Sequence, residues 1–574
     1  MKRWMFVIVP GLAALQSVLH VVQSPSGMTP ATGRVEVTVL GAAADGVVQP
    51  LGDATVTIKN VGATPDAGLS ARTDDDGRAV FDRVPAGYCL VEANRIGYLR
   101  WSYGAPGLGM PGAPVAVAGS GTVEIQLRLP KGAAISGVVT TPSGAPGYRV
   151  PVLVLEPRVV DGVKRFVSAS RALATGGVVS TFTGQDGGYR LYGLPRGRYI
   201  VVARVDTPVE DQPDARQESS VYFPGTMDVA AATPVQLETG QESSGVSFQI
   251  VQTPLARVSG TVGPLPQNFP DHIHVSLTPP ALDPMAVDVR NGRFTFAGVA
   301  PGPYMLWARS VPAPAPPDSD DSMPAWWGRA DIDVGPRGVT DLAIAMNPST
   351  SFAGRIAIDS SATAPGVNFG DVAVSLTPVE AVTGASHVLR VRARANAAGE
   401  FIVRGVTPGK YMIDATLPAR AAGGAYRLSS AVVDGRDLLG LPMDVLQNQP
   451  LPAAVLTLSD GAPEVSGVLE DESGRHPVGC AVVLFAADPA RWTSPSGWIR
   501  TTTPATDGSF RFADVFAGRY WLGAAPGLQL DDASDPAFLG RLATGSVALT
   551  LGRGDRHTEN LRLTGPAPCG GGPR

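Results

Sequence analysis

A short pattern of alternating apolar and polar residues returns five times along this chain of 574 residues. Each copy begins at a turn glycine, and the second and fourth residues after that glycine are apolar or aromatic. A period of two places these side chains on one face of a β-strand. The pattern therefore predicts the same strand at five places, which follow Gly77, Gly187, Gly292, Gly399 and Gly508.

Each copy continues through a second glycine into a second alternating strand. This strand carries a tyrosine near its start and a small residue further along, at Ala93, Ala203, Ala308, Ala415 and Ala524. A small residue that recurs on an inward face is what the close approach of a second sheet requires. The first copy departs at one point, because Tyr88 comes one residue early and Cys89 takes the tyrosine position.

The copies lie about 110 residues apart, which is the size of a whole domain and not of a stacked solenoid repeat. Further β-branched strands precede and follow each copy, and beyond the N-terminus no segment keeps a helical period. We therefore predict an all-β protein with five tandem β-sandwich domains in an elongated array. The expected domains are 31–130, 131–253, 254–349, 350–462 and 463–564, followed by a flexible tail at 565–574.

The motif Asp-Gly-x-Phe-x-Phe, followed by Pro-Gly-x-Tyr and accompanied by opening strands such as ISGVV (135–139), resembles the carboxypeptidase regulatory-like domain. The resemblance implies a transthyretin-like or Ig-like sandwich, grouped with carbohydrate-binding-like and collagen-adhesin modules, over about residues 31 to 564. Segments 220–241 and 535–555 also resemble multi-copy secreted proteins of soil bacteria such as Acidobacteria. Function stays open, because such domains accompany peptidases, outer-membrane receptors and adhesins alike.

The first 24 residues have the character of an export signal. Lys2 and Arg3 precede an apolar stretch from Met5 to Val22, and a turn-rich segment follows. Retention of this segment as an uncleaved anchor is the alternative. We expect an exported monomer in the periplasm, at the cell surface or outside the cell, with no membrane span after signal removal.

The net charge bears on possible partners, and the cysteine content bears on disulfide bonding. A net charge of −5 gives no broad basic surface and argues against a nucleic-acid partner. The three cysteines are Cys89, Cys480 and Cys569, an odd number with no disulfide framework. Cys89 and Cys480 are therefore expected in domain cores that need no disulfide.

The sequence contains no convincing combination of residues for catalysis or for binding a cofactor or metal. None of the six histidines has the glutamate three residues later that a zinc carboxypeptidase needs. His272 and His274 share a strand face but are better explained as surface residues, and the aspartates before Gly77 as a polar turn. Arg553-Gly554-Asp555 has the letters of an adhesion motif but falls at an expected hairpin turn. We predict no enzyme, with no catalytic site, no cofactor and no metal.

The remaining candidate site consists of tryptophans. Trp326 and Trp327 end a Pro-rich acidic segment at 312–327, where we expect a loop that presents two indoles for ligand binding. The alternative is that they cap the core. The leading hypothesis is a non-enzymatic envelope or secreted protein that binds or scaffolds extracellular polysaccharide or protein. The alternative is an accessory subunit of an envelope peptidase, glycosidase or receptor and transport system.

Overall fold

The computed structural model describes residues 31–42, 47–61, 68–160, 163–169, 176–209, 212–251, 255–263, 272–279, 285–310, 325–359, 368–379, 390–417, 426–492, 497–528, 532–563 and 569. β-Strands are the main regular structure of these residues, with only short helices beside them, which confirms the all-β prediction. The predicted export signal and nearly all of the predicted tail lie outside them. Within the described part of the chain, no helix has the length and apolar character of a membrane span.

The strands form five consecutive groups, which we call modules one to five. Module one contains β1 (Thr32–Ala42), β2 (Val48–Pro50), β3 (Thr55–Asn60), β4 (Gly68–Arg72), β5 (Arg78–Pro85), β6 (Gly87–Asn94), β7 (Trp101–Ser102), β8 (Val115–Val117) and β9 (Thr122–Pro130). Module two contains β10 (Ala133–Thr140), β11 (Pro151–Val160), β12 (Val163–Ser168), β13 (Ser180–Phe182), β14 (Gly188–Leu194), β15 (Gly197–Val209), β16 (Gln212–Tyr222), the 3₁₀ helix η1 (Val229–Ala231), β17 (Val235–Leu237), β18 (Glu242–Ser243) and β19 (Phe248–Gln249).

Modules three and four follow the same order. Module three contains β20 (Ala256–Val262), β21 (Ile273–Thr278), β22 (Met285–Asp288), β23 (Arg293–Val299), β24 (Gly302–Ser310), β25 (Trp326–Val334), β26 (Val339–Ile344) and β27 (Asn347–Pro348). Module four contains β28 (Thr350–Asp359), η2 (Phe369–Asp371), β29 (Ala373–Pro378), β30 (Val391–Arg394), β31 (Glu400–Val406), β32 (Gly409–Leu417), β33 (Tyr426–Val433), β34 (Arg436–Asp437), β35 (Pro442–Val445) and β36 (Ala454–Ser459).

Module five adds a short helix that the hydrophobic pattern did not predict. It contains β37 (Glu464–Glu470), β38 (Cys480–Ala486), η4 (Pro489–Arg491), β39 (Ile499–Thr502), β40 (Ser509–Phe512), β41 (Gly518–Pro526), η5 (Asp532–Ser534), α3 (Pro536–Ala543), β42 (Val547–Leu551), β43 (Arg556–Thr558) and β44 (Leu561–Arg562). Asp535 caps α3 by accepting a hydrogen bond from the backbone N–H of Ala537, and Pro536 fits the first turn. One such turn-rich helix is too short to give a clear helical period.

The five modules repeat one topology. The first strand of each pairs antiparallel with the first strand of the repeated motif and parallel with a late strand, as β1 does with β5 and β9. The second motif strand belongs to the other layer, where β6 pairs with β3 and β41 with β38. In module four the layers merge into one nine-stranded sheet. The domain boundaries read from the sequence stay a prediction, because pairing alone does not show independent folding.

The repeated motif has two structural roles. The first glycine of every copy has a positive φ, for example 74° at Gly77 and 77° at Gly508, which favours glycine in the turn between layers. The motif tyrosine donates its hydroxyl to the carbonyl oxygen four residues earlier in three modules, from Tyr199 to Pro195 at 2.9 Å and from Tyr520 to Phe516 at 3.0 Å, and likewise from Tyr411 to Thr407. This bond pins the turn between the two motif strands.

Each of modules one to three encloses an apolar cluster of its own between its layers. Modules four and five share one continuous cluster, which also takes in Trp307 and Trp327 from module three. Tight packing between consecutive modules leaves little room for hinge motion there.

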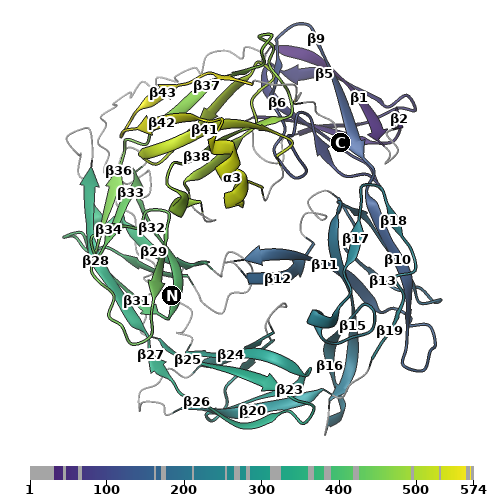
Figure 1. Cartoon of the computed structure of the whole chain (residues 1–574), viewed down its shortest axis with the longest axis vertical. Helices are drawn as coiled ribbons and strands as arrows, with labels where there is room; N and C mark the ends of the chain where they lie inside the picture. Colours follow the sequence, from purple (N-terminus) through teal and green to yellow (C-terminus); the bar gives the residue numbers. More distant parts are fainter. Residues whose placement is uncertain are drawn as a thin grey trace, which may run out of the picture.

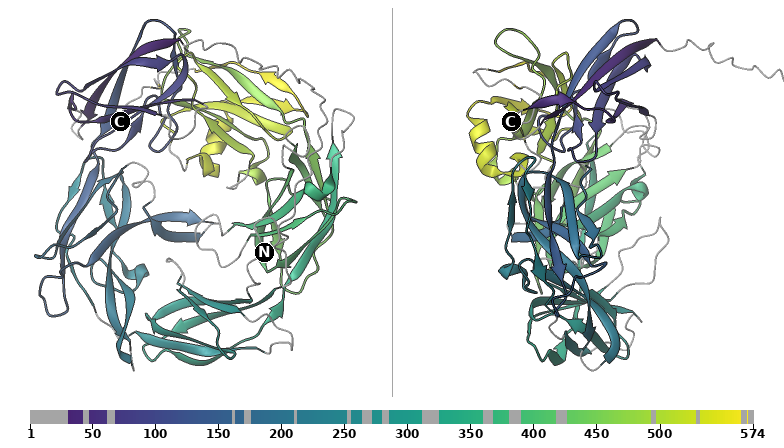
Figure 2. Two further views of the ribbon diagram at one scale, coloured as in Figure 1. Left: turned by 180° about the vertical axis from the view of Figure 1, so that it is seen from behind. Right: turned by 90° about the vertical axis from the view of Figure 1, so that its right-hand side faces the viewer.

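The modules form a ring and not the elongated array expected from the sequence. Figure 1 shows module five, in yellow, beside module one, in purple, and the hairpin of β11 and β12 pointing toward the centre. The side view in Figure 2 shows that the ring is flattened along its axis. Each connection turns the chain in the same sense, so that the two ends of the array meet.

A disulfide corrects a second expectation. Cys480, at the start of β38, is bonded to Cys569, and their Cα atoms are 5.2 Å apart, within the usual range for disulfides. Cys89 is a free, buried thiol, as expected from its motif position. Cys480 lies in the core, but it also ties Cys569 to module five. Disulfides are typical of oxidising compartments, which suggests an exported protein.

Candidate functional site

Modules one and five meet through hydrogen bonds between distant parts of the chain. The hydroxyl of Tyr88 donates to Asp507 Oδ2 at 2.6 Å, and Thr503 Oγ1 donates to the carbonyl oxygen of Pro111 at 2.8 Å. The backbone N–H of Thr506 donates to the carbonyl oxygen of Pro114 at 2.9 Å. These bonds join the two ends of the array and close the ring.

The contact between modules one and five explains why the tyrosine of the first motif copy comes one residue early. Cys89 fills the core position that tyrosine has elsewhere, while Tyr88 points outward to module five. The hydrogen bond to Asp507 is the main cause that raises the pKa of Tyr88. At Asp507 burial acts to raise the pKa, but the hydrogen bonds from Ser509 and Tyr88 outweigh it, so the pKa is lowered. The carboxylate therefore stays ionised as the acceptor of this junction.

Apolar packing completes the same junction. Met110 of module one is 8% exposed and lies in a cluster with Phe485 of β38, Trp492 and Leu539 of α3. This cluster covers the outer face of the β38 and β41 sheet, opposite to the core of module five. The helix missed by the sequence pattern thus helps to build the surface on which module one docks.

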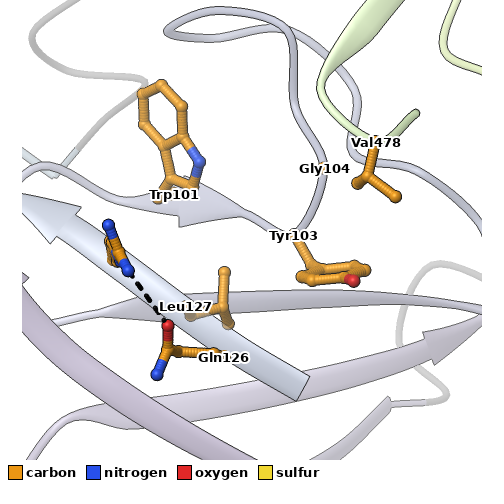
Figure 3. A pocket seen from close by; sticks show the side chains of 7 residues that line it. Trp101, Tyr103, Gly104, Gln126, Leu127 and Val478 are labelled. Atoms are coloured by element: carbon orange, nitrogen blue, oxygen red, sulfur yellow. Dashed lines mark hydrogen bonds between the residues drawn. The ribbon is translucent and has the colours of Figure 1, made fainter. Parts of the chain in front are cut away.

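A pocket of about 170 Å³ lies at the junction and is shown in Figure 3. It is lined by Trp101, Tyr103, Gly104, Gln126, Leu127, Arg128 and Val478. Trp101 stands over β9, which carries Gln126 and Leu127, while Val478 approaches from module five (Figure 3). The pocket is therefore complete only when the ring is closed.

The lining combines flat apolar rings with polar groups that keep unused donors. Trp101 is 9% exposed and Tyr103 is half-buried, whereas Gln126 and Arg128 are exposed. Arg128 Nη2 donates to Gln126 Oε1 at 3.3 Å, and the guanidinium has further N–H groups to offer a ligand. The volume is below the roughly 300 to 1,000 Å³ of pockets for drug-sized ligands, so only a small chemical group could fill it.

The tryptophans chosen from the sequence occupy a different setting from the one expected. Trp326 and Trp327 begin strand β25, and Trp327 is buried with its ring stacked on Trp307 at 5.5 Å. Trp326 is half-buried, and its backbone N–H donates to Ser310 Oγ at 2.8 Å. The preceding segment 312–324 lies outside the described residues. A role of Trp326 in ligand binding stays a prediction, while Trp327 packs as a core residue.

The adhesion-like triplet is part of the junction between modules four and five. Arg553 forms ion pairs with Asp359 and with Asp460, at 2.9 Å for the latter. Asp555 accepts a hydrogen bond from the backbone N–H of Gly552 at 2.6 Å. Both charged side chains of the triplet have partners within the molecule, which favours a structural role.

Metal ligands do not gather in the part of the chain that the structure describes. No group of three histidine, cysteine, aspartate or glutamate residues there could hold an ion. His274 pairs with Asp288 at 2.6 Å. Asp74 Oδ1 accepts hydrogen bonds from the backbone N–H groups of Asp76 and Arg78, as in a polar turn.

Sequence reasoning missed the junction pocket for a physical reason. Trp101 is a tryptophan outside the repeated motif, which is a usable signal in the sequence. Gln126 and Arg128 gave none, because outward polar residues alternate on any half-buried strand. Val478 lies more than three modules away along the chain, so only the tertiary structure brings it to the site.

Comparisons with known proteins show only weak similarity to solved structures. No family model matches the chain, and no curated protein matches it. The Streptococcal ancillary pilin is similar at 14% identity over 54% of this chain and 99% of its own, with a TM-score of 0.19. The shaft pilin SpaA from Lactobacillus rhamnosus GG has 15% identity over 41% of this chain and 100% of its own, with a TM-score of 0.18.

A protein from Pseudomonas aeruginosa, described as a candidate carbohydrate-binding protein, has 16% identity over 18% of this chain and 92% of its own, with a TM-score of 0.13. Likenesses this weak carry no argument about function. The resemblance to the carboxypeptidase regulatory-like domain, and to proteins of soil bacteria, therefore stays a prediction.

Proposed function

We propose that the protein is an exported, non-enzymatic scaffold that binds an extracellular polysaccharide, and that the pocket between modules one and five holds one sugar unit. A single observation carries the proposal. Two aromatic rings, a carboxamide and a guanidinium line one small pocket at the place where the ring closes. Aromatic faces cover apolar parts of a ligand, while amide and guanidinium groups donate hydrogen bonds to hydroxyl and ring oxygens.

The arrangement also explains why five modules are useful. The ring holds the pocket rigidly, because residues from both ends of the array must be in place to complete it. A preformed site loses little conformational entropy when it binds a ligand. The proposed binding is therefore coupled to the integrity of the whole scaffold.

The direct test is a glycan array probed with the mature chain and with Arg128→Ala and Gln126→Ala variants. Both residues are exposed, so their removal should hardly change stability. Loss of a hydrogen bond from a charged donor costs about 1.5 to 3 kcal/mol, which corresponds to at least roughly tenfold weaker binding for Arg128→Ala. The matched control is Arg83→Ala, an exposed arginine on β5 of the same module.

The outcomes separate the parts of the proposal. Equal glycan binding by the wild type and the Arg128→Ala variant would remove the pocket as the site. Binding to no glycan, combined with capture of an envelope protein, would favour the role of an accessory subunit. Export is tested separately by the N-terminal sequence of the protein recovered from culture fractions, where a start near residue 25 is expected.

A further inference from the structure

The outer face of module three carries an aromatic and cationic cluster that module four covers. On β24, Leu306 and Ala308 point into the core of module three, so Trp307 and Arg309 point to the opposite face. Trp327 on β25 lies directly opposite Arg309 in the antiparallel register and shares that face. Both tryptophans belong to the apolar cluster of module four. The three side chains therefore form the contact between modules three and four.

Two side chains of this contact carry buried donors without acceptors. Trp307 is 6% exposed and Arg309 is 7% exposed. Among the residues that the structure describes, Trp307 Nε1 and both Nε and Nη1 of Arg309 find no hydrogen-bond partner. An unsatisfied buried donor destabilises the folded state, and an unpaired buried charge does so more strongly. Such groups in a folded protein call for an explanation, and a bound water or ion is one such explanation.

Other buried indoles of this protein have the hydrogen-bond acceptor that the indole N–H of Trp307 lacks. Trp498 Nε1 donates to the carbonyl oxygen of Leu439 at 2.8 Å, and Trp492 Nε1 donates to that of Ala486 at 2.7 Å. Both of these tryptophans are as buried as Trp307. The fold thus satisfies the indole N–H of Trp498 at the junction of modules four and five and that of Trp492 within module five, whereas the junction of modules three and four leaves that of Trp307 open.

The described neighbours supply no counter-charge for Arg309. Burial lowers the pKa of Arg309, and the phenol of Tyr411 in module four is the group that acts against this. Tyr411 donates its own hydroxyl to the carbonyl oxygen of Thr407 at 2.9 Å. On the same sheet, Asp331 is paired with Arg329 at 3.1 Å, and the carboxylate of Asp288 lies 2.6 Å from Nδ1 of His274, the residue opposite Arg309 on β21.

We propose that the junction of modules three and four binds a small oxyanion, held by the guanidinium of Arg309 and the indole N–H of Trp307. An oxyanion accepts several hydrogen bonds at once and neutralises the buried charge, which a water molecule cannot do. Carboxylate and tetrahedral oxyanions share this chemistry. The bound ion joins β24 of module three to the Tyr411 region of module four and stiffens the ring. The inference does not depend on the sugar site at the other junction.

The test starts from the full chain dialysed into a buffer free of oxyanions. Sodium sulfate and sodium glucuronate are titrated separately by calorimetry and by thermal melting, and the two arms distinguish an inorganic ion from an acidic sugar. Whichever of the two anions binds should raise the melting temperature by several degrees when its concentration is about 100 times its dissociation constant. Arg293→Met, an exposed arginine on the other sheet of module three, is the matched control and should keep the response.

Arg309→Met is the decisive variant, because it keeps the apolar stem and removes the charge. Replacing an unpaired buried charge by an apolar group is often neutral or stabilising. The variant should therefore melt no lower than the wild type in oxyanion-free buffer and should lose the anion response. Trp307→Phe should keep the ring contact but bind the anion about tenfold more weakly, as expected for one lost hydrogen bond.

Three results would overturn the proposal. One is an identical sulfate and glucuronate response in Arg309→Met and in the wild type, which would mark a general salt effect. Another is the absence of anomalous density beside Arg309 in crystals soaked with selenate, a heavy stand-in for sulfate, together with no response of the full chain to glucuronate. The third is a triple variant of the acidic residues Asp318, Asp320 and Asp321, each changed to Asn, that lowers the melting temperature in oxyanion-free buffer. That result would show that the chain itself supplies the counter-charge.

Discussion

Substitution of Met110 by Asp should open the ring without unfolding any module. Met110 contributes to the docking cluster on module five and is not part of the core cluster of module one. Its burial is worth about 1.5 to 3 kcal/mol, so loss of the side chain alone shifts the ratio of open to closed rings by roughly tenfold to 150-fold. A carboxylate in the same apolar setting adds a desolvation cost in the same direction.

The hydrogen bonds that remain at this junction should not compensate for the change. Tyr88 is more than a third exposed, and a hydrogen bond at such a site contributes only about 0.5 to 1.5 kcal/mol. Small-angle X-ray scattering should show a larger maximum dimension for Met110→Asp, with unchanged far-ultraviolet circular dichroism. Ile96→Asp is the control, because Ile96 is 85% exposed on module one and should leave the scattering curve unchanged.

A scattering curve for Met110→Asp that coincides with that of the wild type would refute the reasoning. It would mean that the contacts between neighbouring modules hold the ring closed by themselves. The pocket would give a second readout, since an open ring moves Val478 away from Trp101 and should weaken glycan binding together with the change in shape.

Three further predictions concern the cysteines and the tryptophan pair. Reduction of the bond between Cys480 and Cys569, which are 89 residues apart, should lower stability by up to about 4 to 5 kcal/mol from loop entropy, seen as a lower melting temperature under reducing agent. Burial raises the pKa of the Cys89 thiol from 9.0 to about 11, so the folded protein holds this proton more tightly than the unfolded chain does. The contribution of this thiol to folding stability is therefore fully present below pH 9.0 and is lost as the pH rises toward about 11. Titration of thiols with a disulfide reagent at pH 8 should detect Cys89 only after the protein is denatured. Trp327→Ala should cost about 3 to 5 kcal/mol of folding stability because the side chain is buried, whereas Trp326→Ala should cost clearly less, and equal melting temperatures for the two variants would contradict this placement.

Much of the fold was readable from short-range patterns. The alternation after Gly77 and its four counterparts predicted the two motif strands of every module, because a period of two and a turn glycine are properties of a few consecutive residues. The departure at Tyr88 and Cys89 was also visible, although its purpose was not. The helix α3 escaped, since eight residues with a proline at the start give no sustained period.

The candidate site was less readable than the fold. Trp101 carried a signal as a tryptophan outside the repeat, but Gln126 and Arg128 look like any outward residues of a strand. At Trp326 and Trp327 the Pro-rich acidic segment before them suggested a loop where a strand begins, and ligand binding by this pair stays a prediction. The bond from Cys480 to Cys569 could not be inferred from an odd number of scattered cysteines.

The sequence alone determined that this protein is built from strands in a repeated order, because strand periodicity, turn glycines and recurring alanines act locally within each copy. Only the tertiary structure decided that the array closes on itself. Closure depends on Tyr88 meeting Asp507 and on Met110 meeting α3, contacts between residues hundreds of positions apart whose approach is set by the summed rotations of every module in between. The same accumulation of angles creates the pocket beside Val478, whereas Arg309 is buried by the contact between two adjacent modules.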